Sequence, residues 1–515
     1  MRTNTRVEFG LYDVTARGDS SPACDAAQPF CSLRRDLLVE AVPSQVKYGT
    51  LESRQWLMDG SFSFFPEVPE AYFWGLWSAV QSGESGAFTD PPVLDIQFSQ
   101  AHSSSGLTLH FYAPTGDWAS KLKIQWYGAD GGLLASALFT PDAVDFYCAK
   151  KVDRYCRIRL TFLETNHPGR YLKLAGLDYG VYLHFAGDEI VKAHVLEECD
   201  PLSAEISINT LGLTLYNKEG RFSILNPEGY FDVLQHKQKL TVWEDVRPEA
   251  RSTSSTSYCM GTFYLSDWEN SGDTLADFTA VDAVGLLDGA PYDGGVYDTT
   301  AGALAADILD GYSYTLDEEL AAERVQGYLA AGTRREALQQ LAFAIGAVVD
   351  CSRSDLIRIS PAPARASGMI AYDRKFQDGS KVTLNPLITA VAVTAHRYQA
   401  EDAASELYKD TLEPGTYQVT FSAPAVADSL TVTGATLAGR GVNRCTLTVA
   451  KAGEVCVTGR KYVDSTIVLR RAAANLPPNA QDNELTVTDA TLVSPDRATA
   501  VANRVLDYYA QRYEQ

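Results

Sequence analysis

The side chains best suited to binding a ligand lie in the first third of the chain. Trp118 stands in the loop sequence APTGDWAS, where an exposed indole could stack on the C–H face of a sugar ring. Asp117, His102 and Arg170 could then hydrogen-bond to the sugar hydroxyls. The alternative is that Trp118 packs inside the protein or against a partner protein. The sequence therefore predicts a carbohydrate-binding site at these four residues, with a structural tryptophan as the competing interpretation.

Two other short patterns have simpler explanations than ligand binding. Asp288, Asp293 and Asp298 lie in the stretch DGAPYDGGVYD, and carboxylates in a turn could hold Ca²⁺. Their spacing is not that of a calcium-binding loop, and aspartate is common in turns, so we expect no metal. Arg17-Gly18-Asp19 spells an integrin-binding tripeptide, which we interpret as a chance occurrence in a turn of a polar loop.

Catalytic motifs are hard to find. The sequence contains no His-Glu-x-x-His, no Gly-x-Ser-x-Gly and no phosphate-binding loop. The seven histidines are dispersed, and His110 alternates with Leu109 and Phe111 on an expected strand, so we expect it to face solvent. A glycosidase needs two carboxylates, but no segment resembles a glycosidase domain. We expect a protein that is not an enzyme and needs no cofactor.

The overall charge disfavours several classes of partner. The 515 residues include 44 Lys and Arg and 65 Asp and Glu, so the net charge is 44 − 65 = −21. Phosphate backbones and anionic membrane surfaces attract clustered positive charge, so we expect neither nucleic acid nor such a membrane as a partner. No stretch approaches the roughly 18 apolar residues of a membrane helix, and we see no secretion signal. The nine cysteines lack metal-site spacing and are expected to be reduced thiols.

Alternating apolar residues predict that the elements around the candidate site are strands. Leu107, Leu109 and Phe111 alternate with polar residues, and the stretch CRIRLTFLE from Cys156 to Glu164 does the same. Asp130-Gly131 supplies a hairpin turn, because both residues tolerate positive φ. Residues 1–89 are expected to be a lead-in that is partly β. Residues 90–188 are expected to form an antiparallel β-sandwich of the jelly-roll type.

The remainder of the chain is predicted to mix strands with a few helices. Short strands with Gly, Pro and Asn turns in 189–270 suggest a small barrel, and 271–375 is expected to be α+β. Thr333 with Glu336, and Thr315 with Glu318, match the capping-box pattern at a helix start. A shorter helix is expected from Ala303 to Leu309.

The last expected segment, 376–515, is also mainly β. It is predicted to carry a small β insertion near 410–470. Ser494-Pro495 is expected to open a C-terminal helix whose apolar stripe includes Ala498, Val501 and Val505. The predicted fold class is therefore mainly β with α+β parts.

The first of these segments resembles a known module. The order DPPVLDIQFS, SSGLTLHFY, KLKIQWYGADG, CRIRLTF and RYLKLAGLDYG resembles the discoidin-like, galactose-binding-fold jelly roll over about residues 90–180. Such modules often bind glycans or surfaces through loops at one end. The resemblance implies that a bacterial surface glycan is a possible partner.

The later segments resemble the baseplate hub or tail-tip proteins of tailed phages and phage-like injection particles. The residues that carry this resemblance are HVLEECDPLSAEISINTL, FSILNPEGYFDVLQHKQKLTVWE, MGTFYLSDWE, REALQQLAFAIGAVVDCSR and ANRVLDYYAQRYEQ. The family has two β-barrel domains per chain, and a homotrimer of such chains builds a ring that joins the tail tube to the tip. The resemblance thus implies a second barrel in 376–515, self-association as a trimer, and tail tube and other baseplate proteins as partners. It also implies synthesis in a bacterial cytoplasm and a place in the tail of a virion or phage-like particle.

Two alternatives from other classes remain open. One is a free-standing surface lectin or adhesin whose later domains are spacers. The other is a glycan-active enzyme.

Overall fold

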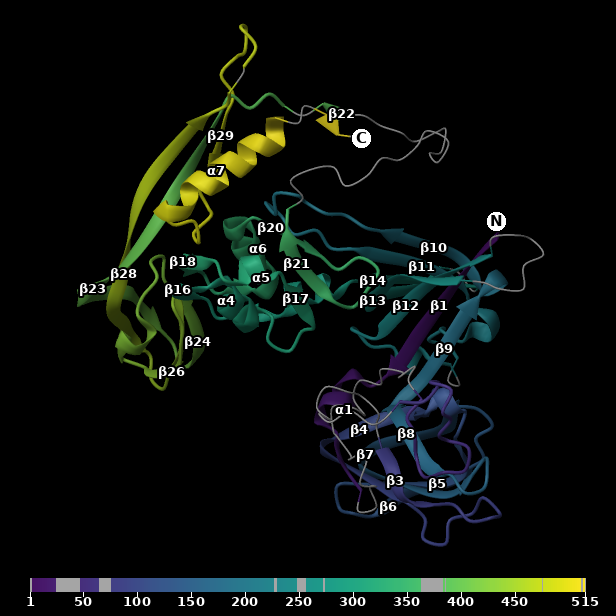
Figure 1. Cartoon of the computed structure of the whole chain (residues 1–515). Helices are drawn as coiled ribbons and strands as arrows, with labels where there is room; N and C mark the ends of the chain where they lie inside the picture. Colours follow the sequence, from purple (N-terminus) through teal and green to yellow (C-terminus); the bar gives the residue numbers. More distant parts are fainter. Residues whose placement is uncertain are drawn as a thin grey trace. The chain divides into compact units, whose positions relative to one another are not determined.

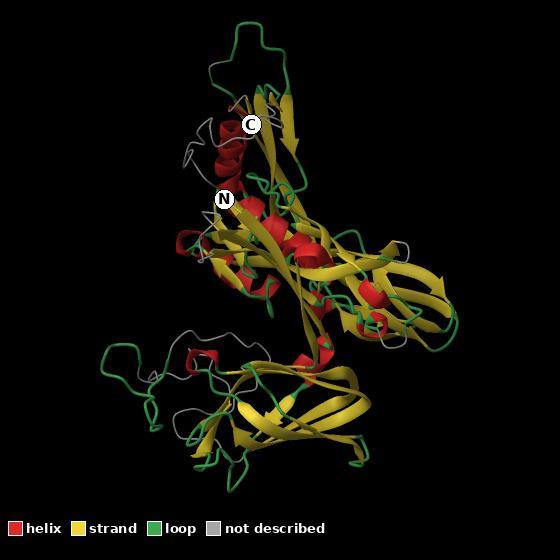
Figure 2. Cartoon of the chain, turned by 90° about the vertical axis from the view of Figure 1, so that its right-hand side faces the viewer, coloured by secondary structure: helices red, strands yellow, loops and turns green. Residues whose placement is uncertain are grey.

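The computed structural model describes residues 2–24, 47–63, 76–226, 229–247, 256–271, 274–362, 383–384, 386–474, 476–510 and 513–514. They form two compact units. Unit 1 contains Met1–His194, Gly212–Cys259 and Tyr264–Ala280, and unit 2 contains Val195–Leu211, Met260–Phe263 and Val281–Gln515. Strands dominate both units, which confirms the predicted mainly β class (Figure 2). The division into five segments stays a prediction.

The predicted sandwich lies in unit 1. Its strands are β2 (Ser21–Ala23), β3 (Leu76–Gln81), β4 (Val93–Phe111), β5 (Ala119–Tyr127), β6 (Leu133–Phe139), β7 (Asp145–Thr165) and β8 (Tyr171–Asp178). They run in the order β3-β8-β4-β7-β5-β6, with β2 paired to β4. Leu109, Trp126 and Ile158 are fully buried in one core, as the period-two pattern predicts. The Asp130-Gly131 turn is confirmed: Gly131 has a φ of 76°, and the Asp130 carboxylate accepts from Gly132 N.

The second sheet of unit 1 corrects the predicted barrel in 189–270. Its order is β10 (Ile190–Leu196), β11 (Thr210–Tyr216), β14 (Leu275–Val281), β13 (Thr256–Ser271), β12 (Lys239–Arg247), β1 (Arg2–Tyr12) and β9 (Gly180–Ala186). This path is open at β10 and β9, so the strands in the described part of the chain close no barrel here. The N-terminal strand β1 enters between β12 and β9. Local turn signals cannot reveal a pairing between residues so far apart in sequence.

Unit 2 contains most of the predicted α+β segment (Figure 1). Its helices are α3 (Ala283–Leu286), α4 (Ala301–Ile308), α5 (Glu318–Ala321) and α6 (Arg334–Ile345). Its strands are β15 (Pro291–Tyr292), β16 (Gly295–Thr300), β17 (Tyr314–Leu316), β18 (Arg324–Leu329), β19 (Gly332–Thr333), β20 (Ala347–Asp350) and β21 (Ile357–Pro361).

One of the two predicted capping boxes is confirmed and the other is wrong. Thr333 and Glu336 form a capping box at the start of α6. Thr315 instead lies in strand β17, where it pairs with β21. Asp317 is the N-cap of α5, and its carboxylate accepts from Glu319 N. Because aspartate caps as well as threonine does, the Thr-x-x-Glu spacing alone misplaced this helix start.

The rest of unit 2 is built on the long antiparallel pair of β23 (Ala390–Leu412) and β28 (Gly453–Ala472). The other strands are β22 (Thr383–Leu384), β24 (Gly415–Thr420), β25 (Thr431–Thr433), β26 (Thr436–Arg440), β27 (Arg444–Val449), β29 (Glu484–Val487) and β30 (Tyr513–Glu514). The sheets run β25-β28-β23-β29 and β24-β27-β26, and β22 pairs with β30.

These sheets confirm the β insertion but close no second barrel among the described residues. The insertion has its own core, which includes Leu447, Val455 and Val457. Helix α7 (Pro495–Ala510) lies along β23 and β28 and buries Ala498, Val501 and Val505, as predicted (Figure 1). No helix in the described ranges is long and apolar enough to cross a membrane. Six of the cysteines there are free thiols: Cys148, Cys156, Cys199, Cys351, Cys445 and Cys456.

Candidate functional site

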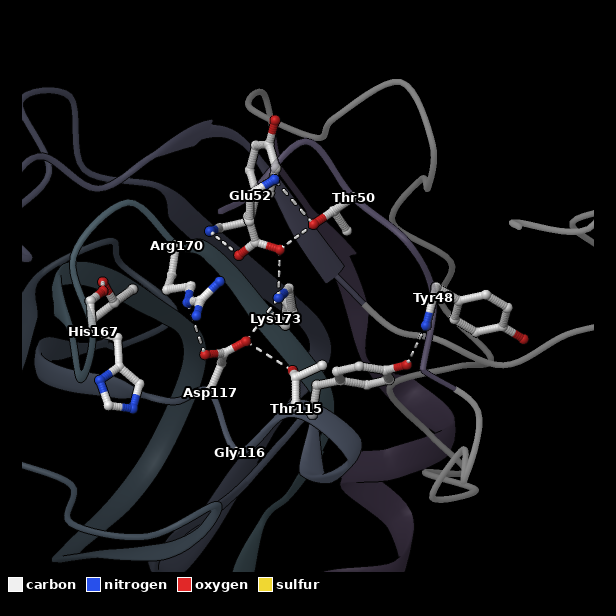
Figure 3. A network of polar contacts seen from close by, with 12 residues as sticks. Tyr48, Thr50, Glu52, Thr115, Gly116, Asp117, His167, Arg170 and Lys173 are labelled. Carbon is white, nitrogen blue, oxygen red and sulfur yellow. Dashed lines mark hydrogen bonds and ion pairs between the residues drawn. The ribbon is translucent and has the colours of Figure 1, made fainter. Parts of the chain in front are cut away.

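A network of buried charges in unit 1 contains two of the four predicted site residues (Figure 3). Lys173 of β8 lies at its centre, with its side chain only 1% exposed. Its Nζ atom is 2.7 Å from Glu52 Oε2 and 2.8 Å from Asp117 Oδ2. Arg170 approaches the other oxygen of Asp117, with Nε at 3.4 Å from Oδ1, and the Thr115 hydroxyl donates to Oδ2. Two cations thus face two carboxylates away from water.

The network is electrically balanced, which explains how it can be buried. An isolated charge in a protein interior is strongly unfavourable, whereas paired and hydrogen-bonded charges are tolerated. The Glu52 carboxylate also accepts hydrogen bonds from Tyr171 N and from the Thr50 hydroxyl. The Lys173 ammonium additionally lies 5.4 Å from the centre of the Trp77 ring, a favourable cation–π arrangement.

Glu52 reaches the network from a loop formed by residues 47–63. Backbone bonds from Gly49 N to Ser63 O and from Ser63 N to Lys47 O close the base of this loop. Arg170 Nη1 donates to Ser53 O at 2.9 Å, so the loop is attached through both Arg170 and Lys173. The loop is therefore fixed to the sandwich through charged groups.

The structure brings Asp117 and Arg170 together, with Trp118 beside Asp117 in the chain. Trp118 is half-buried against the sandwich core, and its indole N–H donates to Pro141 O at 3.1 Å. Asp117 is 1% exposed, and its carboxylate is already bonded to Lys173 and Thr115. A sugar that used Asp117 would have to displace these contacts. The carbohydrate-binding role of these residues stays a prediction.

His102 belongs to a different cluster. Its Nδ1 and Nε2 atoms are each 2.9 Å from a carboxylate oxygen, of Asp13 and Asp19 respectively. Asp13 caps helix α1 (Val14–Asp19), and Asp19 ends it. The tripeptide Arg17-Gly18-Asp19 is therefore helical, which corrects the turn expected from the sequence. His102 attaches α1 to β4.

His110 does not face solvent freely, contrary to the expectation from alternation. Its ring nitrogens lie 2.7 Å from Asp145 Oδ1 and 3.0 Å from Asp178 Oδ2, and its side chain is 22% exposed. The reason is that β4 pairs with both β7 and β8, whose carboxylates surround the ring. Burial alone lowers the pKa of His110, but the hydrogen bonds to Asp145 and Asp178 outweigh it and raise the pKa to about 9.

We predict that this histidine makes stability pH-dependent. A folded-state pKa of about 9, against 6.5 for the free side chain, means that the stabilisation is complete below pH 6.5 and is lost as the pH rises through 9. The loss is expected to be on the order of 3 kcal/mol. Urea unfolding between pH 6 and 10 measures it. His110→Gln should flatten the profile, whereas His167→Gln, at an exposed site, should leave it unchanged. An unchanged profile for His110→Gln would contradict the assignment.

The three aspartates considered for calcium do not surround a common point, because each pairs with a different arginine. Asp288 pairs with Arg335, Asp293 with Arg444 and Asp298 with Arg324. In the part of the chain that the structure describes, no group of three His, Cys, Asp or Glu side chains is arranged to hold a metal ion.

Glu52 and Lys173 are the site residues that sequence reasoning missed. A signal for Lys173 was present, because it interrupts the apolar run YLKLAGL, in which nearly every residue is buried. A lysine inside such a strand needs a buried acidic partner. Glu52 carried no comparable signal, since its partner comes from a distant strand.

No family model matches this chain, and no curated protein matches its sequence. Several solved structures are similar. The prophage tail protein gp18 from Listeria monocytogenes EGD-e is 13% identical over 41% of this chain, with a TM-score of 0.28, and the chain spans 59% of its length. The tail protein from Neisseria meningitidis MC58 is 8% identical, covering 64% of this chain and 76% of its own, with a TM-score of 0.33. The family 32 CBM from C. perfringens NanJ, solved with galactose, is 10% identical over 34% of this chain and 99% of its own, with a TM-score of 0.21.

Proposed function

We propose that this protein is a non-enzymatic structural component of a phage or phage-like tail, at the baseplate hub or tail tip. It would join the tail tube to the tip as a homotrimer in the particle. The sequence blocks that resemble hub proteins support this proposal.

The observation that carries the proposal is a strand edge in unit 2 that no strand of the described residues pairs with. On one side, residues 463–472 of β28 pair with β23. On the other side β28 pairs with β25, but this pairing covers only residues 456–458. Val463, Ile467 and Val468 on this edge are 46%, 57% and 64% exposed. A long, apolar edge strand offers its free N–H and C=O groups to another chain.

The opposite edge of the same sheet supports a ring. Strand β29 ends the sheet on that side, and it runs parallel to β23, whereas β28 runs antiparallel to it. If the β28 edge of one copy met the β29 edge of the next, the two strands would be antiparallel. Such a head-to-tail contact closes into a ring when the rotation between copies permits it. Such a ring would cover both edges of this sheet in every copy.

The N-terminal sandwich would contact a surface glycan in this proposal. The half-buried Trp118, which lies next to the Asp117–Arg170 pair, is the residue proposed for that contact. The role of the later domains would be interface burial and symmetry matching, with no bond broken.

The mass in solution tests the proposal against a free-standing lectin. Three chains of 56.2 kDa give 3 × 56.2 = 168.6 kDa, and sedimentation of the purified chain is expected to show this species. Dissociation on dilution would fit a ring that partner proteins stabilise. A monomer at every concentration that also binds galactose would contradict the hub proposal and favour the lectin.

A further inference from the structure

A polar cavity of about 390 Å³ in unit 2 is separate from the four residues considered above for carbohydrate binding. It is bounded by β16, β18, β23 and the start of α7. We propose that this cavity binds an acidic saccharide, with the carboxylate of the sugar held by Arg397. The proposal does not depend on the tail function, because it uses only contacts within unit 2.

The charges that line the cavity favour an anionic ligand. The Asp298 carboxylate already accepts hydrogen bonds from Arg324, with Nε at 2.7 Å and Nη2 at 2.6 Å. It accepts a third from the side-chain amide of Gln326. Arg397 lines the cavity as well, but among the described residues its guanidinium has no hydrogen-bond or ion-pair partner. The uncompensated charge is therefore positive. A guanidinium binds a carboxylate through two parallel hydrogen bonds.

Two further polar groups are available for hydroxyls. Ser494 is 5% exposed and lines the cavity, and its hydroxyl makes no hydrogen bond within the described ranges. The amide of Gln399 likewise has no partner in the part of the chain that is described. Hydroxyl and amide groups both donate and accept, as the hydroxyls of a sugar do. A ligand hydroxyl could therefore hydrogen-bond to Ser494.

Aromatic rings complete the lining. Tyr297 and Tyr398 are half-buried there. Tyr398 is stacked on His396, with ring centres 6.1 Å apart and planes 8° apart. His396 is itself held by Asp464 and by the Thr488 carbonyl, so the pair of rings has a defined position. An aromatic ring that is fixed in place suits the C–H face of a sugar.

The size of the cavity fits the same class of ligand. Small-molecule sites usually enclose about 300–1,000 Å³, so this cavity suits one or two sugar rings. An unpaired cation, free hydroxyl and amide groups and aromatic rings together match a uronic acid. A simple carboxylate such as acetate would leave the hydroxyl-binding groups unused.

Titration calorimetry on the full chain tests the proposal, with D-glucuronate, D-galacturonate, glucose, galactose and acetate as probes. At least one uronate is expected to bind with a Kd on the order of 1 mM or below, at least about tenfold more tightly than its neutral counterpart or acetate. Arg397→Gln should weaken uronate binding about tenfold or more. Gln399→Ala should weaken it less. Arg471→Gln removes another exposed arginine, from β28, and serves as the matched control, which should bind like the unmodified chain.

Three outcomes would overturn the proposal. The first is no uronate binding at concentrations of about 10 mM. The second is uronate binding that Arg397→Gln leaves unchanged. Loss of binding in Trp118→Ala would likewise contradict the proposal, because it would place the sugar on the sandwich. The third is acetate binding as tight as that of the uronates. Because Arg397 is exposed, its substitution should leave the circular dichroism spectrum unchanged, and failure of the trimer in sedimentation would not affect any of these results.

Discussion

Replacing Lys173 by methionine is expected to lower the free energy of unfolding of unit 1 by about 3–5 kcal/mol. The substitution keeps a side chain of similar length but removes the cation between Glu52 and Asp117, which lie 2.7 and 2.8 Å from it. Two carboxylates would then share a buried site with only Arg170 to compensate them. Urea unfolding followed by tryptophan fluorescence measures the effect, because Trp77 lies beside Lys173 and Trp126 lies in the core of the sandwich.

Two comparisons make this prediction specific. Lys123→Met removes an exposed lysine from the same sandwich and is expected to change stability by less than about 0.5 kcal/mol. Combining Lys173→Met with Glu52→Gln leaves the Arg170–Asp117 pair electrically balanced and should recover part of the loss. If Lys173→Met alone unfolds like the Lys123→Met control, the network contributes little and our interpretation of it is wrong.

The second large effect is expected at the edge of β28. Lysines at Ile467 and Val468 would place two charges where a neighbouring copy is proposed to add its strand. Sedimentation should then show the mass of a single chain where the unmodified protein shows three. Both side chains are exposed, so the circular dichroism spectrum of the variant should be unchanged.

The matched control is Leu225→Lys, at a position that is 88% exposed in a turn of unit 1. It should assemble like the unmodified chain. A double variant that still forms trimers would show that the copies meet elsewhere, whereas loss of assembly in both variants would point to a general effect of added charge.

Sequence reasoning succeeded where a short stretch of chain decides its own conformation. The alternation around Leu109 and Ile158 predicted strands, because side chains of a strand point alternately to its two faces. Thr333 and Glu336 predicted the start of α6, because the two side chains satisfy backbone N–H groups within one turn. The Ser494-Pro495 pattern likewise placed the start of α7, because the fixed φ of proline suits the first helical position. These interactions span only a few residues, so the pattern contains the necessary information.

The candidate site was only partly predictable. Trp118, Asp117 and Arg170 were selected for their residue types, and the structure brings Asp117 to Arg170. The partners that bury them, Glu52 and Lys173, were missed, and His102 proved to be part of another cluster. Burial and pairing depend on which strands become neighbours, and residue type does not specify that.

By itself, the sequence determined the mainly β class, the individual strands and caps, and a net charge that disfavours nucleic acid. Only the tertiary structure decided that β1 enters a sheet with β12 and β9, that this sheet stays open, and that His110 lies between two aspartates. The physical reason is the separation along the chain over which each interaction acts. Alternation and capping act over a few residues, whereas strand neighbours and buried charge pairs join residues that meet only after the whole unit has folded.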